Sequence, residues 1–491
     1  MTRFHHYTSA LLLSTALGLF AGQFAAAADQ ASAAAPAAGT ASDPAQSALL
    51  SRGHYLATAA DCAACHTTQH GQPYAGGLPI VSPVGTIYAS NITPSAKGGI
   101  GAYTEQQFAA ALRKGVRRDG ANLYPAMPYT SYAQFTDTDV HALYTYFMQG
   151  VAAVDKPAPT TALPFPMNIR ASMMGWNLLF LDGKPFKNDP SQTLEWNRGK
   201  YLVLGAAHCS ACHTARGFLM NEEGGKALAG GQVGAWFAPN ITPDPVAGIG
   251  SWSKQDLVSY LRDGKLRGKA QAAGSMGEAV EHSFQHLTDA DLNAMATYVR
   301  SIPAVSQPGA AGAASRFGHG DASAGVIALD ALRGARPVAS VDAGGALLFQ
   351  ANCASCHAAH AEGSKDGYFP SLYHNSVTGG DNANNLIATI VYGVKRTVGK
   401  SEAFMPGFGS GPNDLNPLSD AQVATLATYM MTTYGQGLAQ PVTAAQVAQV
   451  RAGGPGSNLL TLARAGIAGG VVVVVLLLLW WLRRRRAVVR I

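Results

Sequence analysis

One short pattern, present three times, contains every cysteine of this 491-residue sequence. The copies are Cys62-Ala-Ala-Cys65-His66, Cys209-Ser-Ala-Cys212-His213 and Cys353-Ala-Ser-Cys356-His357. A Cys-x-x-Cys-His pattern is typical of covalent haem attachment, because one helical turn sets both thiols beside the two vinyl groups and directs the next imidazole at the iron. The sequence therefore predicts three covalently bound haem c groups, with His66, His213 and His357 as iron ligands.

Three other kinds of site also use closely spaced cysteines: disulfide bonds, zinc knuckles and thioredoxin-like redox pairs. None of them requires a histidine directly after every second cysteine. Zinc would also need a second pair of ligands near each first pair, and the sequence offers none. Covalent haem is therefore preferred to all three.

Other landmarks share the period of the cysteine pattern, whose first cysteines are 147 and 144 residues apart. Asn91-Ile92-Thr93-Pro94, for example, reappears at 240–243. A helix is predicted before each cysteine pattern, and each unit closes with a helix that has a Ser/Thr-Asp start. The amphipathic segments are 104–114, 253–263 and 385–393, and the closing helices are 136–147, 288–299 and 419–430.

Helices before and after a haem attachment turn, with a loop wrapped between them, resemble a class I cytochrome c domain. The predicted fold class is mainly α, with three tandem class I cytochrome c-like domains at 48–155, 190–303 and 337–437. Abundant Ala, Gly and Pro fit short helices joined by long loops. Linkers rich in these residues are predicted around 154–166 and 304–336.

A haem iron held by one histidine takes a second axial ligand, and a thioether raises the reduction potential and closes the iron to other ligands. One methionine per unit precedes the closing helix, in a segment flanked by Pro or Gly that is predicted to be a loop. Met127, Met276 and Met405 are therefore the predicted second axial ligands. Met276 lacks an adjacent proline, and Met220 is its rival. Four other methionines are expected on helices and are predicted to be core residues: Met148, Met295, Met430 and Met431.

The N-terminus predicts export. A short apolar stretch ends in four alanines before Asp29, as in a secretory signal peptide, so 1–28 is the predicted signal and 29–47 a disordered lead-in. Export of the chain favours a periplasmic location.

The C-terminal run 465–482 is apolar and is followed by four arginines, which predicts a transmembrane anchor. A helix of that length spans about 27 Å, close to a roughly 30 Å hydrocarbon core. Residues 483–491 are then the cytoplasmic tail, and the chain is expected on the periplasmic face of the bacterial inner membrane. Most of the net charge of +6 belongs to this tail, so no nucleic-acid partner is indicated.

Three irons ligated by histidine and methionine leave no open coordination position, so electron transfer without catalysis is the predicted role. No catalytic residue is predicted. Gly76-Gly77 and Gly230-Gly231 lack a strand-to-helix context and are predicted to be haem-wrapping loops. Two alternatives stay open: a haem enzyme resembling di-haem peroxidases, which needs one iron without its methionine, and a free-standing electron carrier.

One segment has no role in this scheme. Residues 168–187 include Met173, Met174 and Trp176 and form an amphipathic patch, which is either a partner surface or internal packing. Packing is the preferred interpretation.

The sequence resembles the three-haem cytochrome c subunits of membrane-bound periplasmic dehydrogenases in acetic acid bacteria and their relatives. The likeness lies in 70–77, 91–94, 112–115 and 123–129 of the first unit and in 198–202 and 208–217 of the second. Residues 363–368 and the C-terminal anchor are most similar to subunits that serve flavin-dependent fructose, gluconate or sorbitol dehydrogenases. Cytochromes of quinoprotein alcohol dehydrogenases rank second.

This resemblance implies three partners. They are a catalytic dehydrogenase subunit, with a flavoprotein preferred to a quinoprotein, membrane ubiquinone as the electron acceptor, and a small third subunit.

Overall fold

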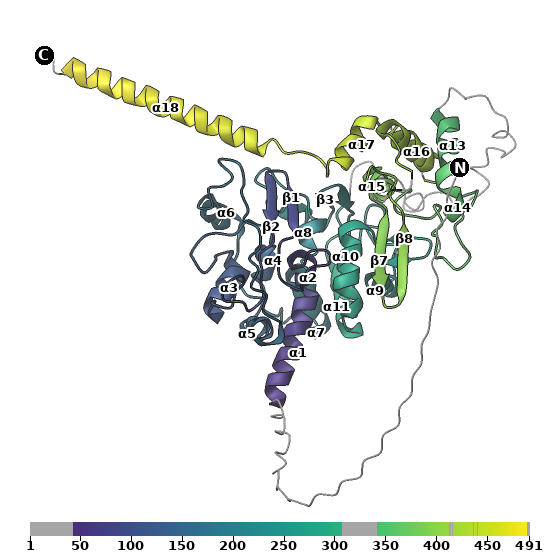
Figure 1. The fold of residues 1–491 in the computed structure, drawn as a ribbon, viewed down its shortest axis with the longest axis horizontal. Helices are drawn as coiled ribbons and strands as arrows, with labels where there is room; N and C mark the ends of the chain where they lie inside the picture. Colours follow the sequence, from purple (N-terminus) through teal and green to yellow (C-terminus); the bar gives the residue numbers. More distant parts are fainter. Residues whose placement is uncertain are drawn as a thin grey trace, which may run out of the picture. The chain divides into compact units, whose positions relative to one another are not determined.

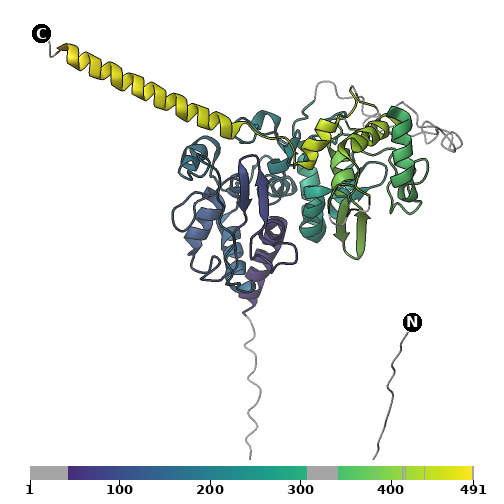
Figure 2. The same cartoon turned by 45° about the horizontal axis from the view of Figure 1, so that its top comes forward.

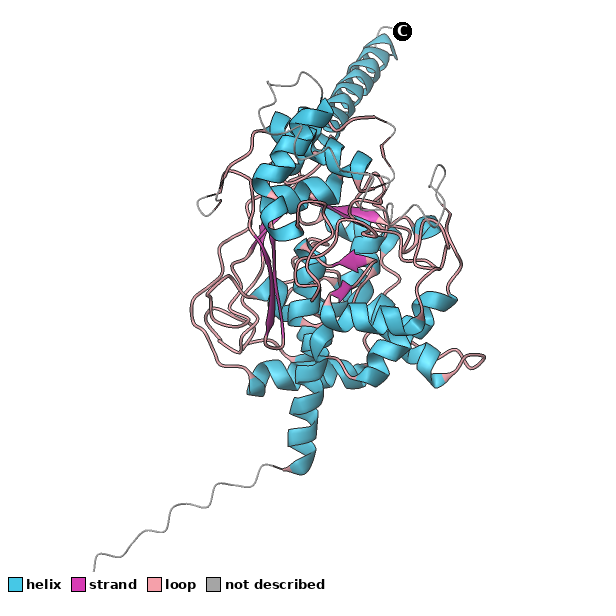
Figure 3. Cartoon of the chain, turned by 90° about the vertical axis from the view of Figure 1, so that its right-hand side faces the viewer, coloured by secondary structure: helices cyan, strands magenta, loops and turns pink. Residues whose placement is uncertain are grey.

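The computed structural model describes residues 43–306 and 341–488, except 381, 412, 413, 415, 436 and 439. The predicted signal peptide, most of the lead-in and most of the 304–336 linker lie outside the described residues. Within the described part, the chain is mainly helical and its strands form only two-stranded antiparallel sheets (Figure 3). The predicted mainly α class is confirmed to that extent.

Each unit begins with a helix that leads to its cysteine pattern and ends with a capped helix (Figure 1). The first unit contains α1 (Pro44–Ala59), α2 (Cys62–His66), β1 (Pro79–Ser82), β2 (Gly85–Tyr88), α3 (Glu105–Lys114), α4 (Tyr129–Tyr132), α5 (Asp137–Thr145) and the π-helical turn η1 (Tyr146–Gly150). A further helix, α6 (Ser172–Phe180), lies between the first two units.

The second unit repeats this order with a longer segment before its last helix. It contains α7 (Leu194–Tyr201), the π-helical turn η2 (Leu202–Ala206), α8 (Ser210–His213), η3 (Gly224–Lys226), β3 (Gly231–Val233), β4 (Trp236–Ala238), α9 (Lys254–Asp263), β5 (Lys265–Leu266), β6 (Ala270–Gln271), α10 (Gly274–His282), η4 (Phe284–His286) and α11 (Asp289–Ser301).

The third unit contains fewer described elements before its long closing helix. They are α13 (Val341–Asn352), α14 (Ala354–His357), α15 (Asn384–Tyr392), β7 (Val394–Val398), β8 (Ser401–Met405) and α16 (Asp420–Thr433). Drawn in shades of green, they lie together in Figures 1 and 2. Two helices follow, α17 (Ala444–Arg451) and α18 (Leu459–Val488).

The closing helices begin where the Ser/Thr-Asp pattern predicts. The side chains of Thr136, Thr288 and Ser419 each accept a hydrogen bond from the backbone N–H three residues later, which satisfies one of the free donors of a helix start. The amphipathic helices α3 and α9 also begin with a capping box. The three repeated helix starts are therefore confirmed.

In each unit the first and last helices cross at a glycine. A Cβ atom added to Gly53 would lie 2.1 Å from the carbonyl oxygen of Ala142, and one added to Gly199 would lie 1.9 Å from that of Ala294. One added to Gly345 would lie 2.3 Å from Cβ of Tyr429. Any side chain at these positions would push the two helices apart. The crossing therefore requires glycine in all three units.

The first two units share one hydrophobic core, whereas the third unit is built around a second core that also contains Ala235 of the second unit. Leu56 and Phe135 of the first unit and Leu202 and Leu292 of the second belong to the same buried cluster. The second cluster is built mainly from α13, α15 and α16 around Phe349. The apolar faces of the first two units are thus buried against each other.

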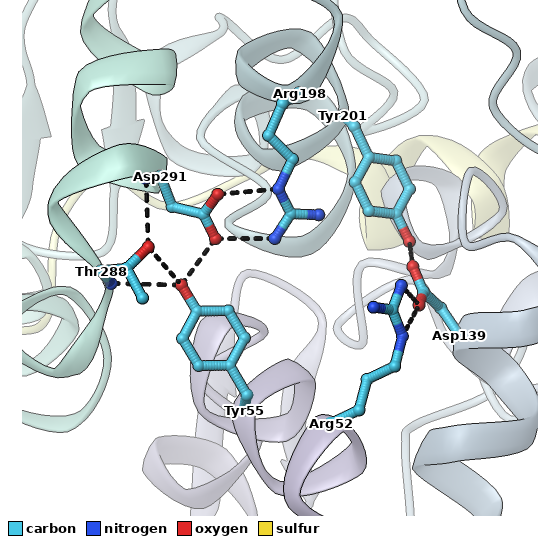
Figure 4. Close-up of polar contacts among 7 residues, drawn as sticks. All are labelled: Arg52, Tyr55, Asp139, Arg198, Tyr201, Thr288 and Asp291. Carbon is cyan, nitrogen blue, oxygen red and sulfur yellow. Dashed lines mark hydrogen bonds and ion pairs between the residues drawn. The ribbon is translucent and has the colours of Figure 1, made fainter. Parts of the chain in front are cut away.

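The contact between the first two units also contains a buried carboxylate from each. Arg52 of α1 donates from Nε to Asp139 of α5 at 2.8 Å, and the hydroxyl of Tyr201 from the second unit donates to the same carboxylate (Figure 4). Asp139 is only 2% exposed, so these partners offset the cost of burying its charge.

The second carboxylate is also bound by an arginine of its own unit and a tyrosine of the other unit. Arg198 of α7 donates to Asp291 of α11 at 2.8 and 2.6 Å, and the hydroxyl of Tyr55 from the first unit donates to Asp291 at 2.6 Å (Figure 4). Burial raises the pKa of Asp291, but the bonds from Arg198 and Tyr55 outweigh it and hold the pKa below its usual value. Each unit thus places a tyrosine on the other unit's ion pair.

Helix α6 does not support the preferred interpretation of 168–187 as packing. None of its residues is buried, and Met174 and Leu178 are 65% and 86% exposed. Only its inner face makes contacts, where Trp176 packs against Tyr129 and its indole N–H donates to the Leu219 carbonyl oxygen at 2.9 Å. The packing prediction is therefore wrong for the outer face.

Helix α18 contains the predicted anchor 465–482. Among the described helices, it alone is long and apolar enough to cross a membrane, over Leu459–Arg485. Its arginines follow directly on the apolar run, as the sequence predicts.

Replacing Tyr55 or Tyr201 by phenylalanine should lower the free energy of unfolding by about 1 to 3 kcal/mol each, because a buried carboxylate loses a donor. Urea unfolding of the detergent-solubilised chain measures this change. Tyr368→Phe is the control, since that tyrosine is 48% exposed in the third unit. Equal small effects for all three variants would contradict a stabilising role for the exchanged tyrosines.

Candidate haem-binding sites

Each cysteine pattern forms one helical turn. Helices α2, α8 and α14 end at His66, His213 and His357, the three predicted iron ligands. All six cysteines lie in the described residues, and no disulfide bond joins any of them. Both thiols and the imidazole of each pattern are therefore presented by one short helix, as covalent haem attachment requires.

Each of these histidines is held by a backbone carbonyl. Nδ1 of His66 donates to the Ser90 carbonyl oxygen at 2.7 Å, and Nδ1 of His213 donates to that of Pro239 at 2.7 Å. Nδ1 of His357 donates to the Pro370 carbonyl oxygen at 2.9 Å. A carbonyl oxygen can only accept, so Nδ1 carries the proton and the lone pair of Nε2 is free for a metal. This is the outer contact that orients a metal-binding histidine.

The protonation states fit the same use. Burial lowers the pKa of His66, His213 and His357, which keeps these imidazoles neutral and able to ligate iron.

The cysteines carry the opposite shift. Burial raises the pKa of Cys62, Cys209 and Cys353 to about 12, so these thiols are protonated near neutral pH rather than thiolates.

Among the described residues, no group of three or more His, Cys, Asp and Glu side chains could hold a metal ion.

The repeated Asn-Ile-Thr-Pro segment supports the histidine contact. Ser90 and Pro239, whose carbonyls bind the histidines, directly precede it. The Oδ1 atom of the buried Asn91 accepts from both the backbone and the hydroxyl of Thr93, and its Nδ2 donates to the Val154 carbonyl oxygen at 2.8 Å. The repeat of this segment in the sequence was a signal for this role, which sequence reasoning did not assign.

The corresponding asparagine of the second unit makes the same contacts. Asn240 accepts from the backbone and hydroxyl of Thr242 and donates to the Val305 carbonyl oxygen at 2.7 Å. In both units the asparagine therefore ties the loop beside the histidine to the chain that follows the closing helix.

Gly76, Gly77 and Gly230 lie in loops that return to the histidines, whereas Gly231 begins strand β3 and not a loop. The N–H of Gly76 donates to the carbonyl oxygen of His66, and the N–H of Gly230 donates to that of His213, both at 2.7 Å. Both glycines have positive φ, and a Cβ atom at Gly76 would lie 2.3 Å from the Ser90 carbonyl carbon. These loops close around the attachment turns and have no strand-to-helix form.

Met127 and Met276 occupy matching backbone positions. In the first unit the N–H of Leu123 donates to the Gly115 carbonyl oxygen at 2.7 Å, and Met127 follows four residues later. In the second unit Ala272 donates to Gly264 at 2.7 Å, and Met276 again follows four residues later. Both methionines pack against the shared core.

Met405 does not occupy the backbone position that Met127 and Met276 share. It ends strand β8 and pairs with Val394, the residue after Gly393, so it corresponds to Asn122 and Gln271 of the other units. It packs against the core of the third unit.

The loop expectation is therefore correct only for Met127. Met276 lies in the first turn of α10 because the chain turns helical at Gly274, and Met405 lies in a strand because the third hairpin is longer. Met220, the rival of Met276, has a φ of 63° in a tight turn, and its carbonyl accepts from Arg216.

The residues present thus fit a covalently held haem in each unit. The cysteines would form the thioether links, and the histidine and methionine would be the axial ligands. When bound, haem c supplies one-electron exchange at its iron.

Comparison with known proteins agrees with this geometry. The chain matches the cytochrome c family over residues 50–150, 197–303 and 342–434. The chain belongs to the cytochrome c family.

Curated relatives cover most of the chain. A fructose dehydrogenase cytochrome subunit of Gluconobacter japonicus is 50% identical over 85% of this chain and 86% of its own length. A cytochrome c subunit of a quinone alcohol dehydrogenase from Gluconacetobacter polyoxogenes is 39% identical over 83% of this chain and 85% of its own. A gluconate 2-dehydrogenase cytochrome c subunit from Pantoea cypripedii is 37% identical over 84% of this chain and 92% of its own length. The resemblance to dehydrogenase cytochrome subunits is confirmed.

Replacing Met127, Met276 or Met405 by leucine should each lower the midpoint potential of one haem, because a thioether ligand favours the reduced iron. The same haem should bind carbon monoxide in the ferrous state, which the unaltered protein should not do. Redox titration and difference spectra measure both effects. Met220→Leu is the control for the second unit, and a response to this variant instead of Met276→Leu would overturn the assignment.

Proposed function

We propose that this chain is the electron-transfer subunit of a membrane-bound dehydrogenase and carries three haem c groups. The electrons come from a flavin-dependent subunit that oxidises a sugar, polyol or sugar acid. The chain passes them on to membrane ubiquinone. The observation that carries the proposal is the threefold attachment turn, each with a neutral imidazole oriented by a backbone carbonyl.

The chain's own residues account for the absence of catalysis in this proposal. A histidine on one side of each iron and a methionine on the other would close both axial positions, which leaves electron exchange as the available chemistry. The ligands are then His66 with Met127, His213 with Met276, and His357 with Met405. The hydrogen bonds to backbone carbonyls hold the three imidazoles in one orientation.

The proposed architecture is three cytochrome c domains, at 48–155, 190–303 and 337–437, followed by an anchor at 465–482. The apolar length of α18 and the arginines after it support a helix that crosses the membrane with its tail in the cytoplasm. The body then lies on the periplasmic face, where quinone is within reach.

A flavoprotein is the preferred catalytic partner, together with a small third subunit. The higher identity to a fructose dehydrogenase cytochrome subunit than to an alcohol dehydrogenase one supports this choice. The cytochrome subunit of a quinoprotein alcohol dehydrogenase is the second candidate. A peroxidase-like enzyme would need an open iron face, and a free-standing carrier would need no stable partner.

Gentle detergent extraction followed by purification through the cytochrome should recover a larger flavoprotein at equal stoichiometry. Recovery of a quinoprotein instead would favour the alcohol dehydrogenase assignment. Recovery of the fully haem-loaded cytochrome alone would contradict the subunit role. A variant ending at Ser457 is the control: it should leave the membrane fraction and still retain the catalytic partner.

A further inference from the structure

One arginine of the third unit is buried in the second unit. Arg396 of strand β7 is 2% exposed, and its Nη1 donates to the carbonyl oxygen of Ala272. Its Nη2 lies 3.5 Å from Oε1 of Gln271, and its Nε has no partner among the described residues. A guanidinium stays charged in proteins. Its hydrogen-bond acceptors here are neutral, and the carboxylates of Glu281 and Asp263 interact with its charge without forming an ion pair with it among the described residues.

The hairpin that carries Arg396 is fixed to the second unit by further bonds. The N–H of Thr397 donates to Oε2 of Glu281 in α10 at 3.1 Å, and Gln285 donates to the Thr397 carbonyl oxygen at 3.0 Å. The N–H of Gly399 donates back to Gln285 at 2.9 Å. Figures 1 and 2 show this hairpin beside the second unit. The guanidinium is therefore held in place by contacts around it.

The position of Arg396 matches that of a side chain in the first unit. A Cβ atom at Gly115 would lie 2.7 Å from Cε1 of Tyr129, which is fully buried two residues after Met127. A Cβ atom at the corresponding Gly264 would lie 2.6 Å from Nε of Arg396. The second unit cannot fill this space itself, because the residue two positions after Met276 is the exposed Glu278.

We propose that Arg396 of the third unit completes the haem site of the second unit as a positioning residue. Its bond to Ala272 holds the segment that leads to Met276, and its charge raises the reduction potential of the haem attached at Cys209 and Cys212. A nearby positive charge disfavours the oxidised iron, and the effect is stronger in a buried, weakly polar setting. This inference rests on the proposed assignment of Met276 as an axial ligand.

The test is a redox titration of the full-length chain carrying Arg396→Met, which removes the charge at similar volume. The expected result is a lower midpoint for one haem, the same one that Met276→Leu lowers, with the other two unchanged. Arg396→Lys keeps the charge and should shift that midpoint by less. Lys395→Gln is the matched control, because Lys395 is an exposed neighbour on the same strand and should shift none.

Three results would overturn the proposal. They are three unchanged midpoints in Arg396→Met, an equal shift in Lys395→Gln, or loss of all three haems in both Arg396 variants, which would indicate a role in folding the whole chain. Loss of the second unit's haem alone would support it. A Met276→Leu variant without any shift would instead contradict the ligand assignment, and so the two failures are distinguishable.

Discussion

The hydrogen bond from a histidine Nδ1 to a backbone carbonyl is the interaction on which the three sites depend. It fixes the tautomer, leaves the lone pair of Nε2 free and ties the attachment turn to a loop 24, 26 or 13 residues further along the chain. Because the acceptor is backbone, the side chains of the loop can vary. The third unit accordingly makes the contact through Pro370 without an Asn-Ile-Thr-Pro segment.

The units are joined in two different ways. A common core and the exchanged contacts of Tyr55 and Tyr201 hold the first two together. The third contacts the second through the hairpin that inserts Arg396 and through Asn385, whose side chain exchanges two hydrogen bonds with the backbone of Phe237. Contacts of this extent suit the proposed relay, because electron exchange over short distances needs sites that keep their spacing.

Much of this fold could be predicted from local patterns. The attachment turns, the capped closing helices and the glycine loops follow from residues close together in the sequence, such as Thr288 with Asp291. Contacts between units could not be predicted, because nothing local pairs Tyr55 with Asp291 or Arg396 with Ala272. The different register of Met405 was also hidden, since a longer hairpin moves a residue without changing its neighbours.

We propose that three haems are bound through paired thioether links at the six cysteines. The intact mass of the mature, denatured chain tests it most directly, because covalent haem stays attached when the protein unfolds. We expect a single species carrying three haem adducts. A mature chain with two or fewer adducts would contradict it.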